Sequence, residues 1–164
     1  MTRGGERKRR ALTRQQLLGR VEQAWQTFQR SHAGLSEAQL VEPGVTGRWS
    51  VRDILAHVTT WEEEALEYLP LILRGGTPPR YSTTYGGIDA FNAKMTEAKR
   101  DLPLEEVLRR MHEVHSRLLE FIAGVPDEQV RGETRFRRRL RLDTYSHYPK
   151  HARAIERWRE RSLF

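Results

Sequence analysis

Hydrophobic residues recur every three or four positions through most of the chain, which is the period of an amphipathic α-helix. The first such stretch begins after Thr13, a suitable N-cap, and ends before Gly34. Its hydrophobic positions are Leu17, Val21, Ala24, Trp25 and Phe28. Residues 34–49 are predicted to form a loop with one short helical turn at residues 36–40.

The second helix has the clearest pattern of the chain. Ser50 is its N-cap and Asp53 follows three residues later, an acidic version of the capping box. Its hydrophobic stripe consists of Ile54, Leu55, Val58, Trp61, Ala65, Leu69 and Ile72. Gly75 and Gly76 end the helix, and the polar loop that follows is rich in Gly, Pro and Tyr. A loop of that length in a helical domain is often functional or mobile.

A third helical region spans residues 88–123 and is interrupted at Pro103, which breaks the helical hydrogen-bond ladder. Residues 33–40 and 123–130 resemble each other, which hints at two similar helix pairs. Residues 133–142, "ETRFRRRLRL", are expected to be briefly extended.

The fourth helix is predicted to start between Leu140 and Tyr148 and to end near Arg161. Pro149 would cost a hydrogen bond deep in this helix and nothing in its first turn, and the sequence leaves both positions open. The predicted fold class is all-α, an up-down four-helix bundle. It forms a single domain over residues 12–164, preceded by a basic, flexible arm at residues 1–11.

The composition excludes several classes of protein. The chain has no cysteine, which rules out disulfides, thiolate nucleophiles and cysteine-ligated metals. No apolar run approaches the length of a membrane span, and no apolar segment of a signal peptide follows the basic start. A cytoplasmic protein without membrane contact is therefore expected.

The net charge of +7 is concentrated in two segments. Residues 1–10 carry +4 and residues 131–141 carry +5, so the rest of the chain is slightly acidic. No nucleic-acid recognition motif accompanies this charge. We expect no specific nucleic-acid binding, and any affinity should depend on counterion release.

Three of the six histidines fall on inward-facing helix positions. His57 lies three residues after Ile54 and four before Trp61, and His147 and His151 are one helical turn apart. Three imidazoles from two helices are enough for a metal site that keeps one coordination position open. The alternative is that each histidine is a core residue with its own hydrogen-bond partner.

The other three histidines are expected to have no role in a site. His32 ends a helix, where a positive charge is favourable. His112 and His115 are expected mainly at the surface or at its boundary, with a position at the edge of the core left open for His115.

Two segments resemble a known family. Residues 47–66, "GRWSVRDILAHVTTWEEEAL", and residues 143–158, "DTYSHYPKHARAIERW", are similar to the second and closing helices of the DinB-like family, which includes the YfiT-like metal-dependent hydrolases. Some likeness to the colibactin self-resistance branch is also visible. The resemblance implies a four-helix bundle, often a homodimer, that holds a divalent metal ion, zinc or nickel, through His57, His147 and His151.

The resemblance favours a metal-dependent hydrolase or thiol S-transferase that acts on a small electrophilic molecule. The transferase would use a low-molecular-weight thiol as its second substrate. Glu64, seven residues after His57, is the expected general base or support for a metal ligand. Tyr81 and Tyr85 are expected at the mouth of the site. The alternative is a non-catalytic protein that binds a ligand or serves a stress response.

Overall fold

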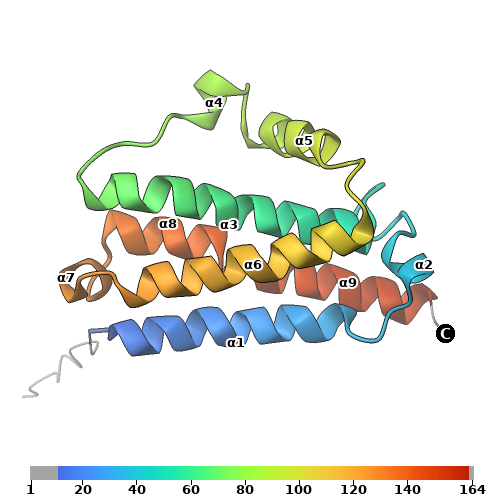
Figure 1. The fold of residues 1–164 in the computed structure, drawn as a ribbon, viewed down its shortest axis with the longest axis horizontal. Helices are drawn as coiled ribbons and strands as arrows, with labels where there is room; N and C mark the ends of the chain where they lie inside the picture. Colours follow the sequence, from blue (N-terminus) through green and yellow to red (C-terminus); the bar gives the residue numbers. More distant parts are fainter. Residues whose placement is uncertain (1–10, 163–164) are drawn as a thin grey trace, which may run out of the picture.

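Four helical rods packed side by side form the body of the protein (Figure 1). The computed structural model describes residues 11–162. The rods are α1 (Arg14–His32), α3 (Val51–Leu73), α6 (Leu104–Ala123) and a fourth rod made of α8 (Arg135–Asp143) and α9 (Tyr148–Ser162). Residues 11–162 contain no β-strand, only an isolated bridge between Thr46 and Trp49. The predicted all-α bundle is confirmed.

The chain does not reverse direction at every step of the bundle. In Figure 1, α3 and α6 both run from right to left, whereas α1 and the α8–α9 rod run from left to right. The connection between α3 and α6 contains α4 (Tyr81–Thr84) and α5 (Ile88–Ala98), which lie outside the four rods, beside α3. This connection returns the chain to the end of the bundle where α3 began, so α3 and α6 are parallel.

The predicted helix starts are confirmed by their caps. Thr13 caps α1 through a capping box with Gln16. The Ser50 hydroxyl accepts from the Asp53 amide at 3.1 Å, and the Asp53 carboxylate accepts from the Ser50 amide at 3.0 Å. The break predicted at Pro103 is also present, because α5 ends at Ala98 and α6 begins directly after Pro103.

The fourth rod differs from the prediction at its first half. Residues 135–143 are helical, so the expectation of an extended segment at 133–142 is wrong. Thr134 caps α8, which buries Phe136 and Leu140, four residues apart on one face. After a turn at residues 144–147, α9 begins at Tyr148, which places Pro149 in the first turn. A helix needs no intrahelical N–H donor there, and Pro149 therefore costs no helical bond.

The two similar segments form matching short helices. They are α2 (Glu37–Leu40), which leads into α3, and α7 (Asp127–Val130), which leads into α8. The helical turn predicted at residues 36–40 is confirmed, with Ser36 as its cap.

One hydrophobic core runs through the bundle and includes residues of every rod. Trp25, Trp61 and Trp158 are buried, and Trp49 packs partly buried against the core. All four tryptophans are thus accommodated within one chain, so they give no support to the predicted homodimer, which stays a prediction.

Only the second of the two basic segments lies within the described residues. Residues 1–10 of the predicted arm lie outside the described residues. In the second segment, Arg137 and Arg141 both pair with Glu133, and Arg139 pairs with Asp143. Part of that charge therefore stabilises α8. Within residues 11–162, every helix is too short or too polar to cross a membrane.

Candidate metal centre

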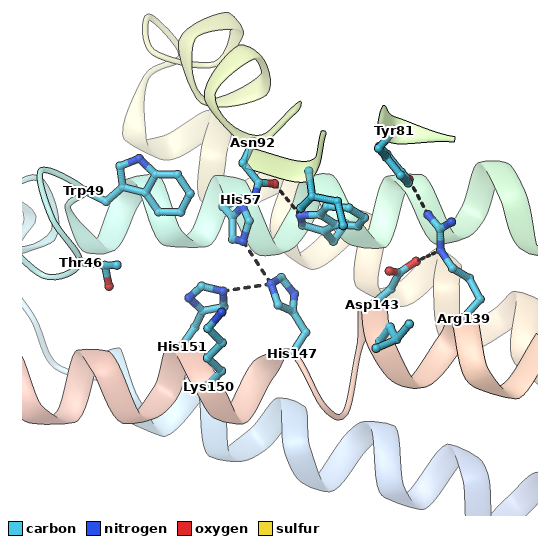
Figure 2. A pocket seen from close by; sticks show the side chains of 13 residues that line it. Thr46, Trp49, His57, Tyr81, Asn92, Arg139, Asp143, His147, Lys150 and His151 are labelled. Atoms are coloured by element: carbon cyan, nitrogen blue, oxygen red, sulfur yellow. Dashed lines mark hydrogen bonds and ion pairs between the residues drawn. The ribbon is translucent and has the colours of Figure 1, made fainter. Parts of the chain in front are cut away.

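The three histidines predicted as metal ligands meet in one place (Figure 2). The Nε2 atom of His147 lies 3.1 Å from that of His57 and 2.9 Å from that of His151. One nitrogen from each ring lies within 4.8 Å of the other two. His57 comes from α3, His151 from α9, and His147 from the turn just before α9. The predicted convergence of the triad is therefore present.

His147 faces His151 although it precedes the helix. The amides of His147 and Tyr148 both donate to the Thr144 carbonyl, at 2.8 and 2.9 Å, so the turn continues almost as a helix would. The Thr144 hydroxyl in turn donates to the Leu140 carbonyl at 2.6 Å, which ties the turn to α8. The spacing of one helical turn is therefore kept without a continuous helix.

The triad is held in its neutral form. Burial, followed by the charges of His151 and Lys150, lowers the pKa of His57 to about 3. Burial and the two neighbouring histidines lower the pKa of His147 to about 2, and burial with Lys150 lowers that of His151 to about 4. Neutral imidazoles keep a lone pair available for a metal ion, without competition from protons near pH 7.

The hydrogen-bonding capacity of the three rings favours a shared ion over hydrogen bonds among the rings alone. With Zn–N bonds of about 2.0–2.1 Å, two ligands of a tetrahedral ion lie about 3.3 Å apart, close to the distances between the Nε2 atoms. Without an ion, the Nε2 atom of His147 faces two other ring nitrogens and has at most one hydrogen to donate. Its Nδ1 atom is buried and has no hydrogen-bond partner among residues 11–162. Hydrogen bonds therefore cannot satisfy this ring in either neutral tautomer.

The triad forms part of the wall of a pocket of about 450 Å³. Trp49 and Trp61 line it as well, and the Trp49 ring centroid lies 4.8 Å from that of His57. The indole N–H of Trp61 donates to the Asn92 side chain at 3.0 Å, which holds α5 against α3 beside the pocket. The pocket thus has aromatic walls around a group of neutral nitrogens, with Ile88 and Leu142 exposed among its lining residues.

A chain of polar side chains extends from the pocket away from the triad. The Arg139 guanidinium donates through Nε to Asp143 at 2.6 Å and through a terminal nitrogen to the Tyr81 hydroxyl at 2.7 Å. The Tyr81 hydroxyl donates to Glu64 at 2.8 Å. Burial raises the pKa of Asp143 to about 7, although Arg139 opposes the shift. Figure 2 shows Asp143 between Arg139 and His147.

The three side chains predicted around the triad lie at different depths. Tyr81 lines the pocket, whereas Tyr85 stacks behind it at 6.1 Å between ring centroids. Glu64 is half-buried, does not line the pocket, and reaches it only through Tyr81. Burial raises the pKa of Glu64, and the Tyr81 hydrogen bond offsets part of the rise.

One expectation for the other histidines is wrong. His115 is buried, because its ring nitrogens contact Glu62 and Glu22 on two other rods. His32 ends α1 as predicted, but burial and the charges of His112 and Arg159 lower its pKa to about 4. The neutral form of His32 is therefore favoured near pH 7.

The sequence did not single out Arg139 and Asp143 as residues of the site. Their spacing of four is a helical signal, but they lie in or next to the Arg-rich segment that was expected to be extended. A helical reading of residues 135–143 would have placed Arg139 and Asp143 on one face, one turn from the triad.

Comparisons with known proteins agree with this architecture. The chain is similar in structure to a colibactin self-resistance protein, ClbS, solved in complex with double-stranded DNA, with a TM-score of 0.75, 17% identity and coverage of 89% of this chain and 94% of that one. An uncharacterised protein from Escherichia coli UTI89 gives a TM-score of 0.79, 15% identity and coverage of 93% and 96%. A protein from Streptococcus pneumoniae gives a TM-score of 0.74, 14% identity and coverage of 98% and 94%.

At these identities the structural similarities show the fold alone. No curated protein is similar enough in sequence to be matched to this chain. The sequence profile of the DinB superfamily, by contrast, matches residues 20–154, which include all three histidines of the triad. The chain belongs to the DinB superfamily.

Proposed function

We propose that the protein is a metal-dependent hydrolase or thiol S-transferase that acts on a small electrophilic molecule. One observation carries the proposal: three neutral imidazoles present converging Nε2 atoms to a pocket of about 450 Å³. That volume is within the range of pockets that bind small molecules. Three protein ligands with an open position are typical of catalytic metal sites, whereas structural sites are closed.

In this proposal His57, His147 and His151 hold a divalent ion, zinc or nickel, both of which imidazole ligands suit. The ion, when bound, supplies Lewis-acid polarisation and lowers the pKa of a nucleophile. Trp49 and Trp61 line the pocket and favour an apolar substrate surface beside the triad.

Two carboxylates have different roles in the proposal. Asp143 lines the pocket, and with a pKa of about 7 it can accept or release a proton near neutral pH. Arg139 fixes its orientation through the hydrogen bond from Nε. Glu64 was predicted as a general base or as support for a ligand, and its contact with Tyr81 supports the role of a positioning residue for this network.

The partners belong to the same proposal. A low-molecular-weight thiol would be the second substrate if the reaction is a transfer, and a homodimer and a cytoplasmic location remain predictions. We also retain the prediction that the chain binds no specific nucleic-acid sequence.

The proposal is tested first by metal binding. Protein purified without a His-tag should contain about one equivalent of divalent metal per chain. His151→Ala should weaken zinc binding by more than about 100-fold. Removal of a residue that only hydrogen-bonds to a metal ligand already lowers metal affinity by up to about 100-fold, and His151 is a proposed ligand itself. The bundle should stay folded, because the His151 imidazole is not part of the hydrophobic core. Isothermal titration calorimetry measures the affinity, and circular dichroism measures the fold.

His112→Ala is the matched control, because His112 is exposed on α6 and lies outside the triad. It should bind zinc as the parent does. A metal-free parent that does not bind added zinc, or a His151→Ala variant that binds as tightly as the parent, would show that the proposal is wrong.

The reaction type needs a second experiment. Zinc-loaded protein is incubated with 1-chloro-2,4-dinitrobenzene and a small epoxide, with and without glutathione, and the products are separated by mass. A thiol adduct formed faster with the parent than with His151→Ala indicates a transferase. A diol formed without thiol indicates a hydrolase.

A further inference from the structure

A second pocket adjoins the histidine pocket along α9. Its volume is about 260 Å³, and Val45 and Thr46, from the loop before α3, form part of its wall. Three residues line both pockets: Thr46, Lys150 and His151. A molecule seated at the triad can therefore continue into the second pocket without leaving the protein surface.

The second pocket is lined by cations and by no acidic residue. Lys150, Arg157 and Arg161 all contribute to its wall. With Ala154 they recur at steps of four, three and four, so they occupy one face of α9. His151 faces the same pockets, which places the cations in a row that starts beside the triad.

These cations have no acidic partner among residues 11–162, where no ion pair involves Lys150, Arg157 or Arg161. Other exposed arginines between residues 11 and 162, such as Arg20 and Arg117, also take part in no ion pair. What distinguishes Lys150, Arg157 and Arg161 is that they line one pocket together. Three unpaired cations around one concave surface repel each other, and a bound anion would relieve that repulsion.

We propose that the second pocket binds an oxyanion, a carboxylate or a phosphate, at the far end of an elongated small molecule whose reactive end lies at the triad. The inference rests on the proposed function for the position of the reactive end. The guanidinium of Arg157 offers a planar pair of donors that matches either oxyanion, and Lys150 adds a compact charge.

The dimensions limit the ligand. At about 1.5 Å per residue along a helix, Arg157 lies about 9 Å beyond His151, and Arg161 lies about 15 Å beyond it. The first pocket has aromatic walls and the second is cationic, so the ligand combines an apolar or uncharged reactive part with an anionic tail. Its length is that of a small metabolite or a short peptide.

The test uses metal-free protein and two small probes, citrate for carboxylates and pyrophosphate for phosphates. Calorimetry measures each affinity for the parent and for the double variant Lys150→Gln/Arg157→Gln. We expect the parent to bind at least one probe and the double variant to bind it at least about tenfold more weakly, since charge-assisted hydrogen bonds contribute most of the affinity. The tighter probe identifies the oxyanion.

Arg153→Gln is the matched control, because Arg153 is exposed on α9 but lines neither pocket. It should bind both probes as the parent does. A parent that binds neither probe, or a double variant that binds as tightly as the parent, overturns the inference. The inference is also wrong if the double variant loses affinity for a 20-base-pair duplex while its affinity for both probes is unchanged.

Zinc binding, measured separately, distinguishes this inference from the proposed function. A parent that binds zinc but neither probe refutes the anion pocket alone. A parent that binds a probe through Lys150 and Arg157 but binds no zinc refutes the proposed function and leaves an anion site.

Discussion

At the scale of single residues, the most informative side chain outside the triad is His115. Its Nδ1 atom lies 3.0 Å from a Glu62 oxygen, and its Nε2 atom lies 2.7 Å from a Glu22 oxygen. A neutral imidazole donates from only one nitrogen, so with both carboxylates ionised the two contacts are hydrogen bonds only when the ring is protonated. Trp25 stacks on the ring at 3.8 Å between centroids, which also favours a cation.

The charge of His115 should make stability depend on pH. Burial alone lowers its pKa, but the hydrogen bonds and charges of Glu62 and Glu22 together raise it above 6.5. The folded state then holds a proton that the unfolded state releases. Stability from this group is fully present below about pH 6.5 and is lost as the pH rises through the folded-state pKa.

We therefore predict that His115→Gln lowers the free energy of unfolding by about 3–5 kcal/mol at pH 6.5, because the buried Glu62 carboxylate loses its partner. The difference between parent and variant should shrink as the pH rises. Urea unfolding between pH 6.5 and 9 measures both effects. His112→Gln, an exposed change on the same helix, should shift the free energy by less than about 0.5 kcal/mol, and a constant difference across this pH range would argue against a protonated His115.

At the scale of secondary-structure elements, Pro149 and Pro70 are expected to have opposite effects on the free energy of unfolding. Pro149 lies in the first turn of α9, where the sequence alone left its position open. Pro70 lies in the interior of α3, where the helix loses a hydrogen bond. Pro149 restricts the unfolded chain without the loss of a helical hydrogen bond, so it should stabilise the fold. Pro70 removes a helical hydrogen bond, so it should lower the free energy of unfolding.

Pro149→Ala should consequently lower the free energy of unfolding by about 0.4–1 kcal/mol, through the added entropy of the unfolded chain. Pro70→Ala should raise it, because the regained helical bond outweighs that entropy. Thermal and urea unfolding of the two variants measure the signs. A stabilised Pro149→Ala variant would indicate that the turn before α9 is strained by the proline.

The elements that the sequence predicted correctly are those specified by local signals. The caps at Thr13 and Ser50 and the breaker Pro103 act within a few residues of one helix, so their positions could be predicted. The α8 helix was missed because Arg and Leu alternate over residues 139–142, a period that imitates a strand. The helical period appears instead in Phe136 and Leu140, which are four residues apart and both buried.

The residues of the candidate site also differ in whether local sequence signals could predict them. The triad could be predicted, because His147 and His151 are one turn apart and His57 lies on a hydrophobic stripe. The burial of His115 could not, because its partners Glu22 and Glu62 are far from it in the chain. Contacts of that kind depend on how the rods pack, and no short segment of sequence specifies them.

At the scale of the whole molecule, the triad lies where separate parts of the bundle meet. His57 belongs to α3, whereas His147 and His151 belong to the turn before α9 and to α9 itself. An ion held by all three would therefore join two rods that are distant in sequence. Because the unfolded chain cannot bring these rings together, metal binding should stabilise the folded state selectively.

Removal of zinc should accordingly lower the free energy of unfolding. At a free zinc concentration 100 times the dissociation constant, the expected loss is about 2.7 kcal/mol, which for a chain of this length lowers the melting temperature by about 5–11 °C. Calorimetric scans of the zinc-loaded protein before and after dialysis against a chelator measure the change. His151→Ala, scanned in the same way, should show almost no difference between the two conditions, because it lacks one of the three ligands. An equal shift in parent and variant would mean that zinc stabilises the protein from some other place on its surface.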